Sequence, residues 1–327
     1  MRSSRAESLT LVKPDGTRVV LAVESREPGE VTTQDIFQVS PGGAYLAYAS
    51  AGTLRVRASD GSERAIVSYN ERSLMRFSPD GKYLAIVTGT EKHPLVLLDL
   101  ASGDQRTLAT FTTVKQLEWM RDGLVANTRN SHDVLVHVPL AGEAKTLFEH
   151  DNIQKFVTAA TATRVVVFVR DGLQSRVLAF DAATPKQTRQ LAAVDEWITN
   201  AAASLDGERI AFTTKSRLYA STFGASAEAI SDRSDIHSLW YSRDGRLGYA
   251  SSSSATILDG RRARRFDAEG QIHMLRFDPV SGQALVATSV HAWDVMASRQ
   301  LTKARDLLGV DHYAGGFVLW SQNRRDN

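Results

Sequence analysis

The feature that most constrains the fold is a hairpin signal that recurs along the chain. In its clearest copy an apolar strand end runs into Ser78-Pro79-Asp80-Gly81, and a strand with alternating apolar residues follows. Proline presets the backbone angle φ at a turn position, and glycine accepts the positive φ that closes the turn without a Cβ clash. The motif therefore predicts two short antiparallel strands joined by a tight turn.

The same turn returns at a nearly constant interval. Turn glycines stand at positions 43, 81, 123, 207, 245, 282 and 316. The interval is about 40 residues if one repeat between 123 and 207 lacks its glycine, and periods of this size are typical of β-propeller blades. Within residues 74–109, four short segments rich in Val, Ile, Leu and Tyr are separated by turns. This pattern predicts one four-stranded blade per repeat.

The repeats predict an all-β propeller formed by a single domain over residues 1–327. Seven stretches carry the full four-strand pattern: 36–66, 74–109, 114–148, 153–191, 198–231, 236–266 and 272–301. Half a repeat remains at each end, with two outer strands in 8–23 and two inner strands in 307–321, the inner ones at 307–310 and 317–321. Joined, they make an eighth blade that would close the ring as a clasp and leave no open sheet. Seven blades are the alternative, because 153–191 has no turn glycine.

The segment 77–85, Phe-Ser-Pro-Asp-Gly-Lys-Tyr-Leu-Ala, and its echo at 203–212 resemble the WD40-like and TolB-like β-propeller repeats. The Trp-Asp pair of WD40 repeats stands at Trp293-Asp294, and the Gly-His pair expected before each innermost strand is missing, a departure from eukaryotic WD40 repeats. The resemblance covers essentially the whole chain. It implies a platform that binds other proteins, or an accessory domain, more often than a catalyst. We expect no cofactor.

Composition and motifs exclude several classes of function. The chain has no cysteine, which rules out thiol catalysis, Cys-ligated zinc and disulfides. Four signatures are absent: Gly-x-Ser-x-Gly, the P-loop, Gly-x-Gly-x-x-Gly and His-Glu-x-x-His. The net charge of +2 gives no sign of nucleic-acid binding. We therefore expect a non-catalytic protein whose partners are other proteins of unknown identity.

The absence of a long apolar run indicates a chain without a membrane span. No run approaches the roughly 18 residues that a spanning helix requires, and the N-terminus lacks the apolar core of a secretory signal. We expect a cytoplasmic, monomeric propeller within a larger complex, or a periplasmic or extracellular one if a signal was removed. The Ala- and Arg-rich, Lys-poor composition suggests a GC-rich bacterial genome.

The innermost strands predict the lining of a central channel, because alternate side chains of a strand point the same way. Arg76 and Arg276, together with Lys155, would attract an anion there. The alternative is that each cation pairs with Glu118 or with backbone carbonyls. The expected lining holds one Glu, one Asn and no His or Asp, which is a poor set of ligands for a metal-dependent hydrolase.

Two surface features suggest partner binding. The connections from each outermost strand to the next innermost strand gather on one face, and they carry residue types enriched at interface hot spots: Tyr69, Arg72, Trp197 and Arg233. Packing of Trp197 between two blades is the alternative. The long connection 24–35 belongs to the same face.

The second feature is a basic run on the outermost strand of the sixth complete repeat: Arg261, Arg262, Arg264 and Arg265. It predicts a docking patch for an acidic protein, anionic lipid or nucleic acid, or else a solvated edge whose charges prevent aggregation. Taken together, the sequence predicts a protein-interaction scaffold or adaptor that uses the loop face. A ligand-sensing or substrate-gating domain that uses the channel is the alternative, and a propeller hydrolase is third.

Overall fold

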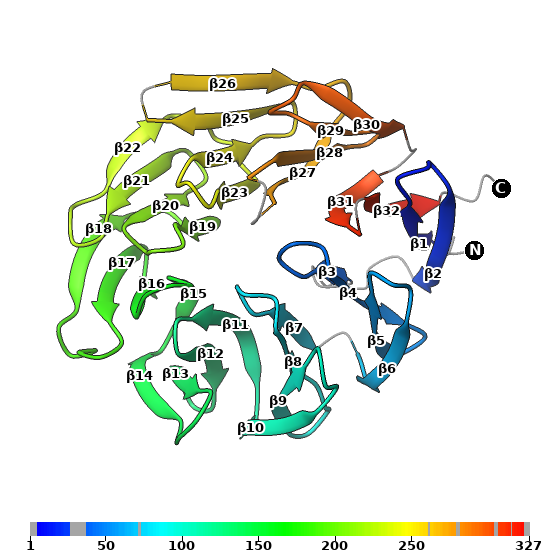
Figure 1. Ribbon diagram of the computed structural model, residues 1–327. Coiled ribbons are helices and arrows are strands. Elements are labelled where there is room, and N and C mark those ends of the chain that lie inside the picture. The colour runs from blue at the N-terminus through cyan, green and yellow to red at the C-terminus, as the bar shows by residue number, and fades with distance from the viewer. Residues whose placement is uncertain are drawn as a thin grey trace, which may run out of the picture.

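The computed structural model describes residues 5–26, 37–70, 73–260, 262–278, 282–303, 307–314 and 316–323. These residues form eight four-stranded antiparallel sheets arranged in a ring (Figure 1). The predicted fold class is therefore confirmed, with eight blades and not seven. The repeat without a turn glycine forms one of them, the sheet β15-β16-β17-β18.

The strands are numbered along the chain, and the blades are numbered from the first complete repeat. Blade 1 comprises β3 (Phe37–Val39), β4 (Tyr45–Ser50), β5 (Thr53–Ala58) and β6 (Glu63–Ser68), and blade 2 comprises β7 (Leu74–Phe77), β8 (Tyr83–Val87), β9 (His93–Asp99) and β10 (Gln105–Phe111). Blade 3 comprises β11 (Val114–Met120), β12 (Gly123–Arg129), β13 (Asp133–Pro139) and β14 (Lys145–His150). Blade 4 comprises β15 (Ile153–Thr158), β16 (Arg164–Asp171), β17 (Gln174–Asp181) and β18 (Arg189–Val194).

Blade 5 comprises β19 (Asn200–Ala203), β20 (Arg209–Thr213), β21 (Leu218–Thr222) and β22 (Glu228–Ser231). Blade 6 comprises β23 (Ser238–Tyr241), β24 (Leu247–Ala250), β25 (Ser254–Asp259) and β26 (Arg262–Asp267). Blade 7 comprises β27 (Ile272–Phe277), β28 (Ala284–Thr288), β29 (His291–Asp294) and β30 (Arg299–Lys303). Blade 8 joins the two ends of the chain in the order β2-β1-β32-β31. Its strands are β1 (Arg5–Val12), β2 (Arg18–Arg26), β31 (Leu307–Tyr313) and β32 (Gly316–Asn323). The predicted clasp is thus confirmed.

The repeated turn is held by a hydrogen-bond network within a few residues. The Ser78 hydroxyl donates to the Asp80 carboxylate at 2.6 Å and accepts from the Tyr83 backbone N–H at 2.9 Å. The backbone N–H of Gly81, which has φ of +71°, donates to the Ser78 carbonyl at 2.9 Å. In blade 4, the Ala159 N–H donates to the Arg164 carbonyl at 3.0 Å and closes the corresponding turn without glycine.

The core lies between the faces of adjacent blades. One cluster joins Leu54 and Val56 of blade 1 to Met75 and Ile86 of blade 2. In blades 1 to 7 the second strand lies deepest, and in β16 six successive residues are buried. Because each buried aliphatic side chain contributes about 1.5–3 kcal/mol, packing between blades is the main source of stability.

Arginines also join four successive blades, blades 4 to 7, at the turns. Each stands at or just before the start of its blade's second strand and donates to a turn carbonyl of the next blade. The bonds are Arg164 to Asp206 at 3.1 Å, Arg209 to Gly245 at 2.7 Å, and Arg246 to Gly282 at 3.1 Å. We refer to these three contacts as the arginine latches.

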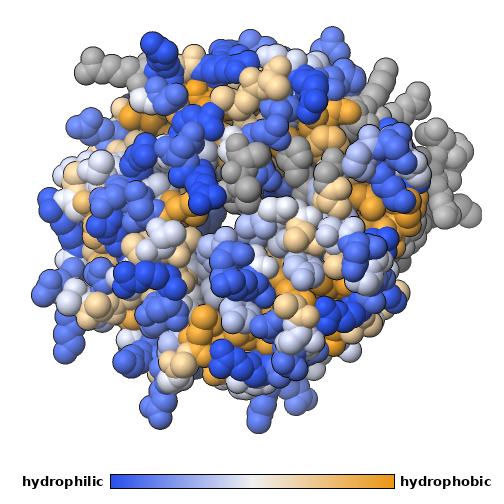
Figure 2. All heavy atoms as spheres, viewed as in Figure 1, coloured by the Kyte–Doolittle hydropathy of each residue, from blue (hydrophilic) through white to orange (hydrophobic). Residues whose placement is uncertain are grey.

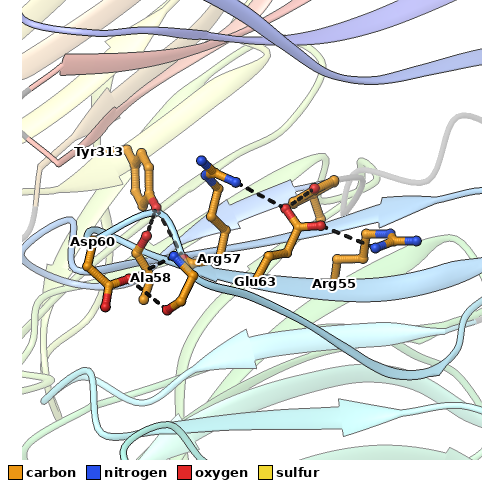
Figure 3. Close-up of polar contacts among 8 residues, drawn as sticks. Arg55, Arg57, Ala58, Asp60, Glu63 and Tyr313 are labelled. Carbon is orange, nitrogen blue, oxygen red and sulfur yellow. Dashed lines mark hydrogen bonds and ion pairs between the residues drawn. The ribbon is translucent and has the colours of Figure 1, made fainter.

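A polar cluster connects blade 8 to blade 1, where the ring closes (Figure 3). The Tyr313 hydroxyl, at the end of β31, donates to the Ala58 carbonyl at 2.5 Å, and burial raises the pKa of Tyr313 to about 12. On the blade 1 side, the Glu63 carboxylate accepts from Arg55 at 3.2 Å and from the Tyr48 hydroxyl at 2.6 Å. Closure therefore depends on specific polar contacts as well as on strand pairing.

Candidate interaction surface

The strand order places two sets of loops on one side of the ring. These are the connections from each outermost strand to the next innermost strand, and the turns between the second and third strands of each blade. We call this side the loop face. Of the four predicted partner-binding residues, the structure describes Tyr69, Trp197 and Arg233, and it gives these three different environments.

Tyr69 is a core residue and not a surface residue. Only 7% of it is exposed, it belongs to the cluster between blades 1 and 2, and its hydroxyl donates to the Ser73 carbonyl at 3.2 Å. Its ring fills the gap between two blades, so this conformation does not present Tyr69 on the surface, and its predicted contact with a partner stays a prediction. Arg72 lies outside the described residues, as do 27–36, which make up most of the long connection.

Trp197 is 58% exposed, although it stands in a connection that hydrogen bonds hold in place. The Ser175 hydroxyl donates to the Glu196 carbonyl at 2.7 Å. The Glu196 carboxylate accepts from the Ser216 hydroxyl at 2.5 Å and from its backbone N–H at 3.0 Å, and these bonds lower the pKa of Glu196. Trp197 thus does not pack between blades, which was the alternative expectation.

A buried arginine supports the exposed indole. The guanidinium carbon of Arg170 lies 5.0 Å from the centroid of the Trp197 ring, within the range of a cation–π contact. Arg170 also donates to the Gly172 carbonyl at 2.9 Å and to the Ser175 hydroxyl at 3.0 Å. Its side-chain hydrogen bonds and its ring contact with described residues are all to uncharged groups, and they hold the guanidinium beneath the ring.

Leu173 follows Gly172 in the turn between β16 and β17 and is 83% exposed. The same guanidinium therefore anchors both the turn that carries Leu173 and the ring of Trp197. We define the Trp197 patch as Trp197, Leu173 and Arg170. Sequence reasoning missed the last two residues; an apolar side chain in an otherwise polar turn, Asp171-Gly172-Leu173-Gln174, was the available signal.

Arg233 lies one connection further around the ring. It is partly buried and donates to the Ser254 hydroxyl at 2.7 Å, in the third strand of blade 6. Its neighbour Asp232 forms an ion pair with Arg217 at 3.1 Å. No contact given by the described residues joins Arg233 to the Trp197 patch, so the two are separate parts of the loop face.

The predicted channel cations have protein partners. Arg276 forms an ion pair with Asp311 of blade 8 at 2.7 Å, and its guanidinium carbon lies 5.8 Å from the centroid of the Trp240 ring. Arg76 donates to the Met75 carbonyl at 2.8 Å. Lys155 donates to the Thr199 carbonyl at 3.1 Å, and burial lowers the pKa of its ammonium group. The contacts of Arg76 and Lys155 favour the alternative interpretation, pairing with backbone carbonyls, over a free anion site, whereas Arg276 pairs with a carboxylate that neither interpretation named.

The sequence analysis missed Asp311 for a simple reason. The predicted inner strand ended at residue 310, whereas β31 continues to Tyr313 and brings Asp311 beside Arg276. Only 5% of the Asp311 side chain is exposed. A carboxylate at this position offsets the charge of Arg276.

Figure 2 shows the face of the ring hollowed at its centre, with hydrophilic side chains dominating the outer rim.

The basic run lies on β26 at the outer rim of blade 6. Arg262, Arg264 and Arg265 are exposed, and Arg261 lies outside the described residues. Arg264 donates to the Met296 carbonyl at 2.6 Å and to the Ser298 hydroxyl at 2.7 Å in blade 7. Arg265 pairs with Asp267 at 2.7 Å. Part of the run is therefore engaged within the protein.

The described part of the chain contains neither a metal-binding cluster nor a membrane-spanning helix. No group of three or more His, Asp or Glu side chains there is arranged to hold a metal ion. Nor does that part of the chain contain a helix long and apolar enough to cross a membrane.

Comparisons with known proteins identify the fold. No protein-family model matches the chain, and no curated protein matches it. Among solved structures, Sqt1 of Saccharomyces cerevisiae has a TM-score of 0.62 at 11% identity, covering 88% of this chain and 95% of that one.

A prolyl endopeptidase structure has a TM-score of 0.63 at 13% identity, covering 89% of this chain but only 50% of that one. Chaetomium thermophilum Sqt1, solved bound to the N-terminus of the ribosomal protein L10, has a TM-score of 0.51 at 14% identity, covering 72% of this chain and 76% of that one. The resemblance to WD40-like β-propellers is thus confirmed for the fold, and identities this low show the fold alone.

Proposed function

We propose that this chain is a non-catalytic protein-interaction scaffold whose partner docks on the loop face at the Trp197 patch. The observation that carries the proposal is the exposure of Trp197, 58%, in a connection that several hydrogen bonds hold in place. A large ring held in position loses little conformational entropy on binding, which is why Trp is enriched among interface hot spots.

The binding free energy that burial of Trp197 would contribute is of the size expected for an interface hot spot. A Trp side chain buries about 150–250 Å² when it is fully covered, at about 25 cal/mol per Å². Covering the exposed part of Trp197 would therefore contribute roughly 2–4 kcal/mol, the range of a hot spot. Leu173 adds a second exposed apolar side chain anchored by the same guanidinium. The solved complex of a similar propeller with a protein segment supports the idea that this fold suits protein binding.

Site-specific photo-crosslinking tests the proposal in the full chain. A photoreactive amino acid replaces Leu173 in one variant and Ile230, 44% exposed on the outer strand β22, in a matched control. We expect adducts with a small set of proteins from position 173 only. Trp197→Ala should abolish these adducts, whereas Ile230→Ala should leave them unchanged.

Two outcomes would contradict the proposal. One is the same set of adducts from positions 173 and 230, which would indicate non-specific contact. The other is a set of adducts from position 173 that Trp197→Ala leaves intact, because the indole would then contribute nothing to docking.

A ligand-binding role for the central channel is the second candidate. Trp240 on the innermost strand β23 is 43% exposed, and Arg276 lies over its ring. Because Asp311 compensates Arg276, a planar uncharged molecule suits this wall better than an anion does. Thermal-shift screening of metabolites against the wild type and Trp240→Ala separates this role from the first.

A further inference from the structure

The outermost strand of blade 6, β26, differs from the other seven outermost strands. In those seven, pairing with the neighbouring strand shifts register at a bulge or other irregularity. In contrast, β26 pairs with β25 in unbroken register from Asp259↔Arg262 to Ser254↔Asp267. Bulges twist an edge and interrupt its row of backbone groups, and this protects the edge from pairing with another chain. Among the described outer edges, β26 alone lacks that protection.

The backbone polar groups of β26 alternate between β25 and solvent. The Ala268 N–H, just beyond the strand, donates to the Ser253 carbonyl at 3.1 Å. In a regular antiparallel ladder, every second residue points the same way. The N–H and C=O groups of Ala263, Arg265 and Asp267 therefore point outward, at the rim of the ring (Figure 1). Five of the six residues of β26 are exposed, so an incoming strand could reach these groups.

The side chains make this edge positive. Arg262 is exposed and has no hydrogen-bond or ion-pair partner among the described residues. Arg265 pairs with Asp267, but 53% and 70% of the two side chains are exposed, so water screens the pair. A second copy of β26 would place arginines near arginines, and like charges on paired strands destabilise a sheet. A strand rich in carboxylates would face no such repulsion.

We propose that the β26 edge binds an extended acidic segment of a partner protein, which adds to blade 6 as a fifth strand. Backbone hydrogen bonds to residues 263, 265 and 267 supply affinity, and Arg262 and Arg265 select acidic side chains. This surface lies on the outer rim of blade 6, whereas the Trp197 patch lies on the loop face beside blades 4 and 5. The two surfaces can therefore serve different partners.

Fluorescence anisotropy with the full chain tests this inference. The probe is a labelled peptide of about eight residues in which pairs of Glu alternate with pairs of Val, so that carboxylates lie on both faces of the strand, as Arg262 and Arg265 do. Its length is typical of a strand. The same peptide with Lys in place of Glu is the charge control. We expect saturable binding of the Glu peptide only, weakened by added salt.

Ala263→Pro is the most direct variant. Proline removes the outward N–H at an edge position without removing a hydrogen bond to β25, so the blade should fold. We expect at least a tenfold loss of affinity. Arg262→Glu should also weaken binding about tenfold, whereas Arg106→Glu, an exposed arginine on the bulged outer strand β10, should not. Trp197→Ala should bind the peptide like the wild type, which separates this site from the proposed scaffold face.

Hydrogen exchange read by mass spectrometry provides a second measurement that does not depend on the proline variant. Added Glu peptide should slow exchange in residues 262–267, and the double variant Arg262→Glu with Arg265→Glu should lose this protection. The inference is wrong if Ala263→Pro folds and binds normally, if Arg106→Glu weakens binding as much as Arg262→Glu, or if residues 262–267 gain no protection. Binding of oligodeoxythymidine without binding of the peptide would also overturn it, in favour of nucleic acid.

Discussion

Replacement of Gly245 by alanine should lower the free energy of unfolding in two ways, through backbone strain and through loss of a hydrogen bond from Arg209. Gly245 has φ of +79°, a conformation that costs an L-residue about 1–2 kcal/mol. A Cβ at this position would also overlap the Arg209 guanidinium and displace it from the Gly245 carbonyl, to which it donates at 2.7 Å. The substitution therefore removes an arginine latch in addition to straining the backbone.

Gly16 is the matched control, because it has φ of +84° and a Cβ added there would meet no described atom within 4 Å. Gly16→Ala should show only the backbone cost. A hydrogen bond to a charged group contributes about 1.5–3 kcal/mol, and exposure of Arg209 to solvent reduces this to about 1–2 kcal/mol. Gly245→Ala should therefore lower the free energy of unfolding by about 1–2 kcal/mol more than Gly16→Ala does.

A double-mutant cycle in urea checks the attribution to Arg209. In an Arg209→Ala background the latch is already absent, so Gly245→Ala should cost only as much as Gly16→Ala. Far-UV circular dichroism and tryptophan fluorescence should be followed in the same titration, since coincident curves justify a two-state treatment. The latch is refuted if Gly245→Ala and Gly16→Ala lower the free energy of unfolding equally in the wild type. It is also refuted if the larger loss caused by Gly245→Ala persists in the Arg209→Ala background.

The ring closure and the channel give further predictions. Tyr313→Phe should lower the free energy of unfolding by about 1 kcal/mol in urea titrations, because the bond to the Ala58 carbonyl is lost. Burial raises the pKa of Tyr313 to about 12, so the unfolded chain releases this proton first as the pH rises through 10 to 12. Stability should fall over that window in the wild type, and less in Tyr313→Phe; equal slopes would contradict the assignment. Arg276→Met should destabilise the protein by about 1–3 kcal/mol, because Asp311 is left buried beside an apolar group. Adding Asp311→Asn should recover part of that loss, and sulfate should raise the melting temperature of the wild type and of Arg276→Met equally.

The architecture could be predicted from the sequence because its signal is local and repeated. The Ser78-Asp80-Gly81 turn is closed by atoms within a few residues of one another, so each copy reports its own hairpin. The regular spacing of these hairpins predicts the number of blades, which is eight when the blade shared by the two ends of the chain is counted. The glycine-free turn of blade 4 was recovered only through the strands that follow it, since Ala159 closes that turn with ordinary backbone hydrogen bonds.

The candidate surface was less predictable, because exposure of a loop side chain depends on the neighbouring blade. Tyr69 and Trp197 are both aromatic residues in corresponding connections. The Tyr69 ring reaches the cluster between two blades, whereas the Trp197 ring rests on Arg170 and remains exposed. No periodic pattern distinguishes these two cases. The pairing of Arg276 with Asp311 was hidden for the same reason, since it depends on how blades 7 and 8 meet.

The shared eighth blade has a consequence for biosynthesis. β1 pairs with β32, and the Ser8 and Ser321 hydroxyls lie 3.0 Å apart although 313 positions separate them in the chain. At ~5–20 residues per second, a ribosome needs on the order of tens of seconds to make the intervening chain. During that time the hairpin of β1 and β2 has no inner strands to pair with. The first strands made must therefore wait for the last ones, and premature pairing of that hairpin with another nascent chain would yield an interlinked pair of propellers.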